Sequence, residues 1–223
     1  MPADGSNIGA FFDLDGTLLT VNSGKLWMIS ERREGRLHRQ HIATAVVFFA
    51  AYRIGMIDMR MAMRRALSTV EGLAEETIRD RTAAWYEREV KQHAAPGAWP
   101  VIAGHREQGH RLVLLTSSSP YEAGVACEHF GLEFPISMRY EVRDGRFTGE
   151  VCQPMCYGAG KVALAERFAA EHDIDLDRSF FYSDSITDLP MLERVGRPVA
   201  VDPDPRLRLA AWWRRWPVVN WSG

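Results

Sequence analysis

The chain has 223 residues, 46% of them hydrophobic and 25% charged, with a formal net charge of −2. This length and apolar content suit one large or two small domains with a buried core. The longest apolar run, residues 42–52, is far shorter than the ~20 residues of a membrane span, and neither a leader sequence nor a strongly basic run is recognised. We therefore expect a cytoplasmic protein that binds neither membranes nor nucleic acid, and we leave its oligomeric state open.

The three cysteines are Cys127, Cys152 and Cys156, and they form no Cys-x-x-Cys pair. An odd number of cysteines without a signal peptide indicates a reducing compartment. We expect ordinary, partly buried thiols. A metal or redox role for Cys152 and Cys156 is the alternative.

A short apolar strand is predicted over residues 8–13, and two carboxylates, Asp13 and Asp15, stand at its end. Gly16 then bends the chain and Thr17 follows. Alternate residues of an extended chain point to the same side, so both carboxylates can face one site. Their repulsion favours a hard cation with oxygen ligands, and one acid could attack an electrophile while the other moves protons. The alternative is an ordinary Asp-Gly turn.

Helical patterns dominate residues 24–93, and the Ala-Pro-Gly sequence at 95–97 marks their end. The apolar run over 42–52 is interpreted as a buried helix. Residues 24–95 hold 13 Lys plus Arg against 9 Asp plus Glu, a charge of +4, whereas the rest of the chain carries −6. A positive insert above an acidic site would suit an anionic substrate. The alternative is that these charges form ordinary pairs on solvated helix faces.

Hydroxyl side chains gather where the next predicted strand meets a helix. After a predicted helix over 98–109, the strand 111–116 ends in Thr116 and is followed by Ser117 and two more serines. Pro120 suits the first turn of the helix predicted over 120–130. Hydroxyl and free N–H groups at such a junction form an anion site. The alternative is a polar loop with a serine N-cap.

One lysine lies where a later helix begins. Alternation around Asp144-Gly145 predicts a hairpin over 136–151, and the helix predicted over 159–172 has Lys161 in its first turn. The positive end of the helix dipole disfavours a cation there, so an anion nearby would explain the lysine. The alternative is an exposed surface lysine.

A second strand end is acidic. The strand predicted over 179–183 runs into Asp184, and Asp188 begins the helix predicted over 188–196. A strand over 198–201, a helix over 205–214 and a short strand near 217–220 follow. Strands that alternate with helices imply an α/β fold with a doubly wound, Rossmann-like parallel sheet, whose ligands bind at the carboxyl ends of the strands. Asp13, Thr116 and Asp184 all fall at such ends, although a helix cap is the alternative for the last segment.

Together these segments resemble the haloacid dehalogenase superfamily of phosphatases, whose motifs occur in the same order. The segments DGRFTGEV (144–151), SDSITDLPML (183–192) and VDPDPRLR (201–208) are similar to the branch that holds phosphoserine phosphatase and related histidinol-phosphate phosphatases. The similarity covers nearly the whole chain, from about residue 8 to 219, and is weakest over 24–95. It implies a Rossmann-like catalytic core of residues 1–22 and 94–223, and an inserted all-helical cap domain of residues 23–93.

The resemblance implies Mg²⁺-dependent hydrolysis of a phosphomonoester through an aspartyl-phosphate. Asp13 would be the nucleophile and a metal ligand, and Asp184 would be the second carboxylate ligand. Asp15 would offer its backbone carbonyl to the metal, and its side chain would act as general acid and then general base.

The same resemblance assigns the phosphate contacts. Thr116 and the Ser117 N–H would hold phosphate oxygens, and Lys161 would neutralise their charge. Asp188 would orient Lys161, and Thr17 is expected to support the site from behind.

The start of the insert is expected to read the leaving group. In phosphoserine phosphatase an acid nine positions after the nucleophile helps to bind the substrate amine, and here that position is Asn22. We expect Asn22, Ser23 and Lys25 to contact a small soluble phosphate ester, with histidinol phosphate as one candidate. Trp27 could stack on a ring, although an aromatic of the cap core is the alternative. A phosphotransferase with an acceptor other than water, or a non-catalytic binding module, are the other functions considered.

Overall fold

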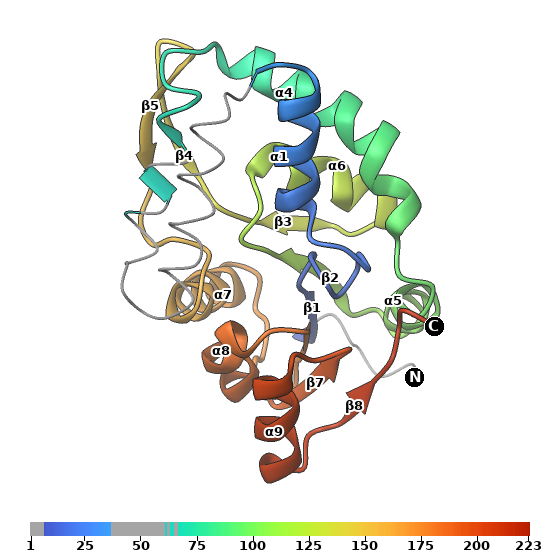
Figure 1. Ribbon diagram of the computed structural model, residues 1–223. Helices are drawn as coiled ribbons and strands as arrows, with labels where there is room; N and C mark the ends of the chain where they lie inside the picture. The colour runs from blue at the N-terminus through green and yellow to red at the C-terminus, as the bar shows by residue number, and fades with distance from the viewer. Residues whose placement is uncertain (1–6, 37–60, 62, 65–66) are drawn as a thin grey trace.

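The computed structural model describes residues 7–36, 61, 63, 64 and 67–223. These residues form a central sheet with helices on both faces and a smaller group of elements above one of its edges (Figure 1). The apolar run over 42–52, predicted to be a buried helix, lies outside the described residues.

The central sheet is parallel throughout, as predicted. Its strand order is β3-β2-β1-β6-β7-β8, and every neighbouring pair is parallel. The strands are β1 Gly9–Phe12, β2 Arg111–Leu115, β3 Phe134–Ile136, β6 Phe180–Ser183, β7 Arg197–Val201 and β8 Val218–Val219. The helices between them are α5 Ala98–Glu107, α6 Pro120–Phe130, α7 Ala159–Glu171, α8 Leu189–Arg194 and α9 Pro205–Arg214, with a 3₁₀ turn over Ile186–Asp188 before α8.

The side chains of the central strands point alternately to two apolar layers. Ala10 and Phe12 of β1 pack with α5 and α6, whereas Phe11 packs with α7, α8 and α9. All four residues of β1 are buried. A strand covered on both faces has no polar alternation, which explains the continuous apolar runs before the acidic motifs.

The predicted hairpin began too early in the chain. The structure ends β3 at Ile136, which pairs with Leu115 in the parallel sheet, and the hairpin strands are β4 Tyr140–Arg143 and β5 Arg146–Val151. A three-residue strand that contains Pro135 gives no strand signal, because proline has no N–H for the ladder and is tolerated only at a sheet edge.

The hairpin joins the inserted segment instead of the parallel sheet. Phe147 exchanges backbone hydrogen bonds with two residues of this segment: Gly72 N donates to Phe147 O at 2.8 Å, and Phe147 N donates to Leu73 O at 3.1 Å. The N–H of Glu75 donates to Gly145 O at 2.8 Å. Residues 72–74 are therefore irregular backbone paired with the hairpin, where the sequence predicted helix.

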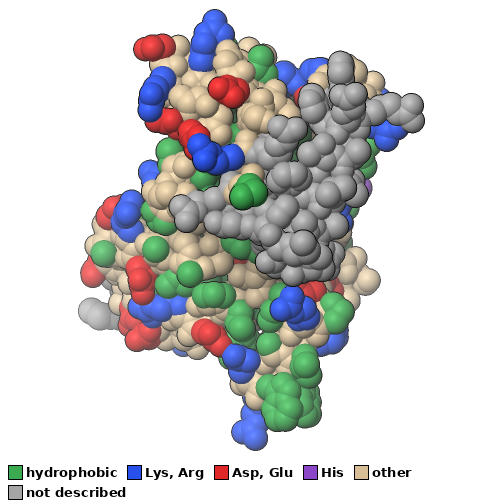
Figure 2. Space-filling view, turned by 60° about the vertical axis from the view of Figure 1, so that its left-hand side comes forward, with side chains coloured by type: hydrophobic (Ala, Val, Ile, Leu, Met, Phe, Trp, Pro, Cys, Tyr) green, Lys and Arg blue, Asp and Glu red, His purple; other side chains and the backbone are tan. Residues whose placement is uncertain are grey.

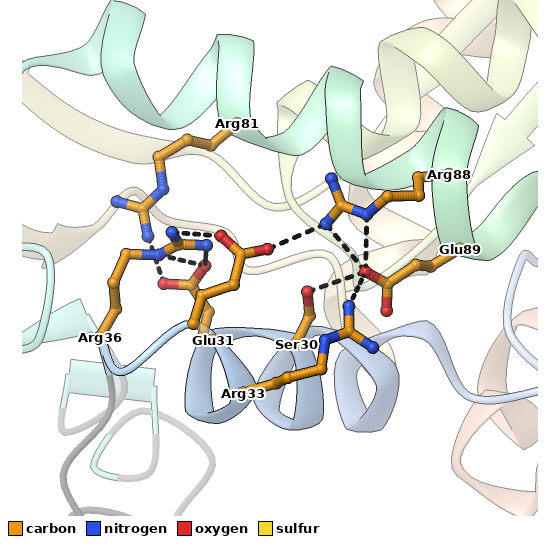
Figure 3. A network of polar contacts seen from close by, with 8 residues as sticks. Ser30, Glu31, Arg33, Arg36, Arg81, Arg88 and Glu89 are labelled. Carbon is orange, nitrogen blue, oxygen red and sulfur yellow. Dashed lines mark hydrogen bonds and ion pairs between the residues drawn. The ribbon is translucent and has the colours of Figure 1, made fainter.

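Helices α1 Ser23–Arg33 and α4 Glu75–Trp85 form most of the described insert, and α4 continues into a π turn over Tyr86–Val90 and a 3₁₀ turn over Lys91–His93. An ion-pair network joins α1 to α4 and the π turn (Figure 3). In this network four arginines contact the carboxylates of Glu31, Glu34 and Glu89. The arginines are Arg33, Arg36, Arg81 and Arg88. These four arginines fit the interpretation of the insert's charge as ordinary ion pairs.

One surface helix is apolar on both sides. Leu207 and Ala211 of α9 are buried, whereas Leu209, Trp212 and Trp213 are more than half exposed. Figure 2 shows hydrophobic side chains gathered with Lys and Arg at the lower end of the molecule, where Figure 1 places α9. Within the described part of the chain, no helix has the length and apolar character needed to cross a membrane.

Two buried histidines connect α5 to the sheet. His105 Nδ1 lies 2.7 Å from His110 Nδ1, and His105 Nε2 lies 2.8 Å from the hydroxyl of Tyr182 on β6. Burial, together with the charges of His110 and Arg197, lowers the pKa of His105 to about 4. The folded protein therefore holds His105 neutral at a pH where an unfolded chain would protonate it.

We expect His105 to make stability fall as the pH drops from about 6.5 towards 4. In this range the unfolded state binds a proton that the folded state does not, which costs on the order of 2 kcal/mol at pH 5. Urea unfolding of wild type and His105→Gln should give a stability difference that shrinks between pH 7.5 and pH 5. Acidic groups common to both proteins cancel in this difference, so a constant difference would contradict the prediction.

Candidate active site

Three neighbouring strands deliver polar residues to one edge of the sheet, as the sequence predicted. Asp13 follows β1, Thr116 follows β2 and Asp184 follows β6, and the strand order places β1 between the other two. The Asp13 N–H donates to the carbonyl of Tyr182 at 3.0 Å, which extends the β1–β6 pairing up to this residue. The backbone pairing between β1 and β6 therefore fixes the position of the Asp13 Cα atom.

Lys161 lies in the first turn of α7 and is buried, with only 2% of its surface exposed. Its Nζ donates to Asp13 Oδ1 at 2.8 Å and to Asp188 Oδ2 at 2.7 Å. The alternative of an exposed surface lysine is therefore wrong, and two carboxylates are the anions that explain a cation at a helix start. Asp188 also accepts a hydrogen bond from Ser183 Oγ at 2.8 Å and makes no side-chain cap bond to α8.

The site holds more negative charge than Lys161 neutralises. Burial disfavours the charged form of Lys161, but Asp13 and Asp188 outweigh this effect and hold its pKa above the usual range. Burial raises the pKa of Asp13 to about 7, against the lowering effect of Lys161, and the charges of Asp188 and Asp15 add to the rise. Burial, Asp13 and Asp188 raise the pKa of Asp184 to about 8. Both carboxyls would ionise more readily beside an added cation.

Gly16 leaves the space that Asp184 occupies. Its φ is +75°, and a Cβ at this position would lie 2.3 Å from Asp184 Oδ2. Glycine is thus required both by the backbone conformation and by the approach of the carboxylate. Thr17 is buried behind this turn, and its Oγ1 has no hydrogen-bond partner among the described residues.

The residues at this edge fit a Mg²⁺ site. No group of three His, Cys, Asp or Glu side chains gathers as a metal cage in the described residues. Mg²⁺ is usually bound by one or two carboxylates, with substrate oxygens and water filling its other positions. Asp13 and Asp184 supply two carboxylates whose pKa values are raised first by burial and then by neighbouring carboxylates, which is the electrostatic condition that a cation relieves.

Asp15 is held by the start of α1. Its Oδ1 accepts from the Ser23 N–H at 2.8 Å, and its Oδ2 accepts from Asn22 Nδ2 at 3.3 Å. Asn22 also caps α1, since its Oδ1 accepts from the Lys25 N–H at 3.0 Å. Burial raises the pKa of Asp15, while its interactions with Ser23 lower it. The sequence assigned Asn22 and Ser23 to substrate contact only and missed that they orient Asp15.

The two other residues proposed to read the leaving group differ in their surroundings. Lys25 is exposed on the first turn of α1. Trp27 packs edge-on against Trp85 with ring centroids 5.0 Å apart, and the Arg81 guanidinium lies 6.0 Å from its ring. These contacts favour the interpretation of Trp27 as an aromatic of the cap core.

The loop after β2 has both features that the sequence suggested, a group of hydroxyl side chains at the strand end and a serine N-cap. Thr116 is buried and its Oγ1 accepts from the Ser118 N–H at 3.1 Å, while Ser117 is exposed beside it. Ser119 caps α6, because its Oγ accepts from the Glu122 N–H at 3.1 Å. A serine cap and a loop of hydroxyls at the sheet edge therefore coexist.

Sequence reasoning missed a buried acid beside Asp15. Glu122, on the first turn of α6, is 6% exposed. Burial and then the charge of Asp15 raise its pKa to about 8. The spacing Ser119-x-x-Glu122 is that of a capping box, so helix capping explains the glutamate locally. The sequence therefore did not indicate that Glu122 lies near the site.

The predicted thiols are ordinary. Cys127, Cys152 and Cys156 are all free; the first and last are buried and Cys152 is half-buried. Burial raises the pKa of Cys127 and of Cys156 to about 12. Thiols of this kind are mostly protonated and unreactive at neutral pH.

Comparisons with known proteins agree with this geometry. Residues 10–193 match the family model of haloacid dehalogenase-like hydrolases. The chain is 32% identical over 224 residues to a probable phosphatase of Mycobacterium tuberculosis H37Rv, covering 96% of this chain and 75% of that protein. It is 27% identical to a histidinol-phosphatase of Neisseria meningitidis serogroup C, covering 96% and 98% of the two chains.

A solved structure shares the whole fold. The crystal structure of a protein of unknown function from Bordetella pertussis Tohama I superposes with a TM-score of 0.87 at 28% identity, covering 96% of this chain and 98% of that chain. The parallel sheet, the acidic strand ends and these relatives agree, and the chain belongs to the haloacid dehalogenase-like hydrolase family, in which it is a phosphatase.

Proposed function

We propose that the protein is a Mg²⁺-dependent phosphomonoesterase that transfers the phosphoryl group of a small soluble metabolite to Asp13 and then to water. The observation that carries this proposal is the buried contact of Asp13 with Lys161 at the carboxyl end of β1, with Asp184 near enough for the charge of Asp13 to raise its pKa. A carboxylate held in this way by a cation has one oxygen fixed and can direct the other towards an incoming phosphorus atom.

Charge neutralisation is the first requirement of this reaction. An anionic phosphate approaches carboxylates only if their charge is attenuated, and bound Mg²⁺ supplies this attenuation. Asp13, Asp184 and the backbone carbonyl of Asp15 would hold the ion. Lys161, fixed between Asp13 and Asp188, would carry positive charge next to the phosphate oxygens, which Thr116 and the Ser117 N–H would bind.

Proton transfer is the role proposed for the Asp15 side chain. Two hydrogen bonds from the start of α1 hold its carboxyl group. Burial raises its pKa, which favours a form that can give a proton to the leaving alcohol oxygen. The resulting carboxylate would then take a proton from the water that attacks phospho-Asp13.

The proposed substrate is a small phosphate ester, with histidinol phosphate or a related ester as the first to be tested. A relative that matches nearly end to end is named a histidinol-phosphatase, which supports this choice. We propose that residues 23–93 act as a cap over a core of residues 1–22 and 94–223. A cap inserted directly after the nucleophile strand would exclude bulk water and would leave no room for a macromolecular substrate.

Removal of the metal should abolish activity. We expect excess chelator to stop phosphatase turnover and Mg²⁺ to restore it, whereas Ca²⁺ should restore it poorly because of its looser coordination. Apparent Mg²⁺ affinity should rise between pH 6 and pH 8, because Asp13 and Asp184, with pKa values of about 7 and about 8, must lose protons to bind the ion. Full turnover in excess chelator would refute the metal-dependent mechanism.

Substitutions of Asp13 and Asp15 should impair different steps of the reaction. Asp13→Asn should prevent formation of a phospho-enzyme, because an amide is no nucleophile. Asp15→Asn should slow turnover by on the order of a hundredfold or more while leaving the fold intact. Rapid-quench labelling with a phosphate ester and circular dichroism would check these outcomes, and normal turnover of Asp13→Asn would remove it as the nucleophile.

Lys25 tests the contact between the cap and the leaving group. If this exposed lysine binds an anionic leaving group, Lys25→Ala should raise KM for the physiological substrate more than for a generic aryl phosphate. Steady-state kinetics on a phosphomonoester panel would measure both values. Equal changes for both substrates would place Lys25 outside the site.

A further inference from the structure

The outward-facing side of α9 presents large apolar side chains that no described residue covers. Leu209, Trp212 and Trp213 are 58%, 67% and 70% exposed, and the two indole rings lie with their centroids 4.9 Å apart. We call these three residues the tryptophan face. Single exposed apolar residues are ordinary on a protein surface, whereas a cluster that includes two adjacent tryptophans marks an interaction surface.

The packing of α9 fixes the direction of the tryptophan face. Leu207 and Ala211 lie one helical turn apart and are buried in the core. A helix turns by about 100° per residue, so the tryptophan face lies on the opposite side of α9, away from the core. Asp204 caps the helix, since its Oδ1 accepts from the N–H groups of Arg206 and Leu207 at 2.8 and 2.9 Å. A capped and anchored helix therefore holds this face towards solvent.

Arginines border the tryptophan face. From α9 to the end of the chain the sequence has four arginines and no Asp or Glu. By the same helical geometry Arg206 and Arg208 lie on either side of the face, and Arg215 follows the helix. All three are exposed and form no ion pair within the described part of the chain, whereas Arg214 is bound by Glu193 at 2.5 Å. The lower end of the molecule thus combines exposed indole rings with positive charge that no acid neutralises (Figure 2).

Side-chain type and charge together indicate the partner. A second copy of the chain would bring the arginines of both copies to one interface, because a twofold interface uses the same patch twice. A nucleic acid would pair with arginines and stack on tryptophans, but it would leave the Leu209 side chain without an apolar partner. An anionic membrane surface suits all three kinds of side chain, with indole rings among the headgroups, leucine at the acyl boundary and arginines on the lipid phosphates.

We propose that the tryptophan face, with the three arginines beside it, docks α9 on a membrane that contains anionic phospholipids. The helix lies parallel to the membrane surface and inserts its indole rings among the headgroups. Such binding requires no spanning helix, and none occurs among the described residues. The sequence-based expectation of no membrane binding rested on the lack of a long apolar or strongly basic run, which does not bear on a helix that binds along its side. The proposal goes beyond the proposed function, because it concerns where the enzyme acts and not the reaction.

Flotation with lipid vesicles tests the role of the arginines. Vesicles of equal parts phosphatidylcholine and phosphatidylglycerol should bind wild type at least tenfold more tightly than vesicles of phosphatidylcholine alone, and raised salt should weaken this binding. The double variant Arg206→Gln/Arg208→Gln should bind the mixed vesicles at least fivefold more weakly than wild type. Arg167→Gln removes an exposed arginine from α7 and should bind as wild type does.

The same assay tests the apolar part of the face. The double variant Trp212→Ser/Trp213→Ser should bind the mixed vesicles at least tenfold more weakly than wild type. Ile29→Ser on α1 removes a side chain that is 59% exposed, as Leu209 nearly is, and should keep wild-type binding. Brominated phospholipids in the vesicles should quench part of the tryptophan fluorescence of bound wild type, and this measurement needs no variant.

Several outcomes would overturn the membrane proposal. Wild type would bind neither kind of vesicle, the double tryptophan variant would bind as wild type does, or bound wild type would show no quenching. A dimer in sedimentation equilibrium, or a complex with a single-stranded oligonucleotide, that forms without vesicle binding and is lost in the double tryptophan variant would also overturn it and would assign the tryptophan face to that partner.

Discussion

The buried ammonium group of Lys161 is the contact on which the geometry of the site depends. It joins Asp13, 148 positions earlier in the chain, to Asp188, 27 positions later, and so connects β1, α7 and the 3₁₀ turn after β6. A buried charge without partners would be costly, so the three elements must meet in one arrangement. Asp13 is thereby fixed between the backbone ladder of β1 and β6 and a cation.

One lysine does not balance the acids around it. Asp13, Asp15 and Asp184 all have raised pKa values, and each is raised first by burial. A protein that maintains such a cluster loses stability unless a cation or protons compensate, which is the usual condition of sites that bind a metal and act on anions. The same logic extends to Glu122, whose pKa is raised by burial and then by the charge of Asp15.

The insert is connected to this cluster at its first residues. Asn22 begins α1 and, with the Ser23 N–H, holds the carboxyl group of Asp15, while arginine–glutamate pairs bind α1 to α4 and the π turn. The hairpin β4–β5 pairs with residues 72–75 of the same insert. A movement of α1 would therefore carry Asn22 and Ser23 with it, which couples the position of the insert to the orientation of Asp15.

The sequence by itself determined the α/β class, the parallel sheet and the strand ends that carry Asp13, Thr116 and Asp184, because apolar strands alternating with helices admit few other arrangements. It could not determine the edge strand with Pro135, whose short and proline-interrupted pattern gives no strand signal. Nor could it decide that Lys161 is buried, that Asn22 orients Asp15, or that Glu122 lies near the site. Each of these depends on which distant residues meet a side chain, and only the tertiary structure brings those residues together.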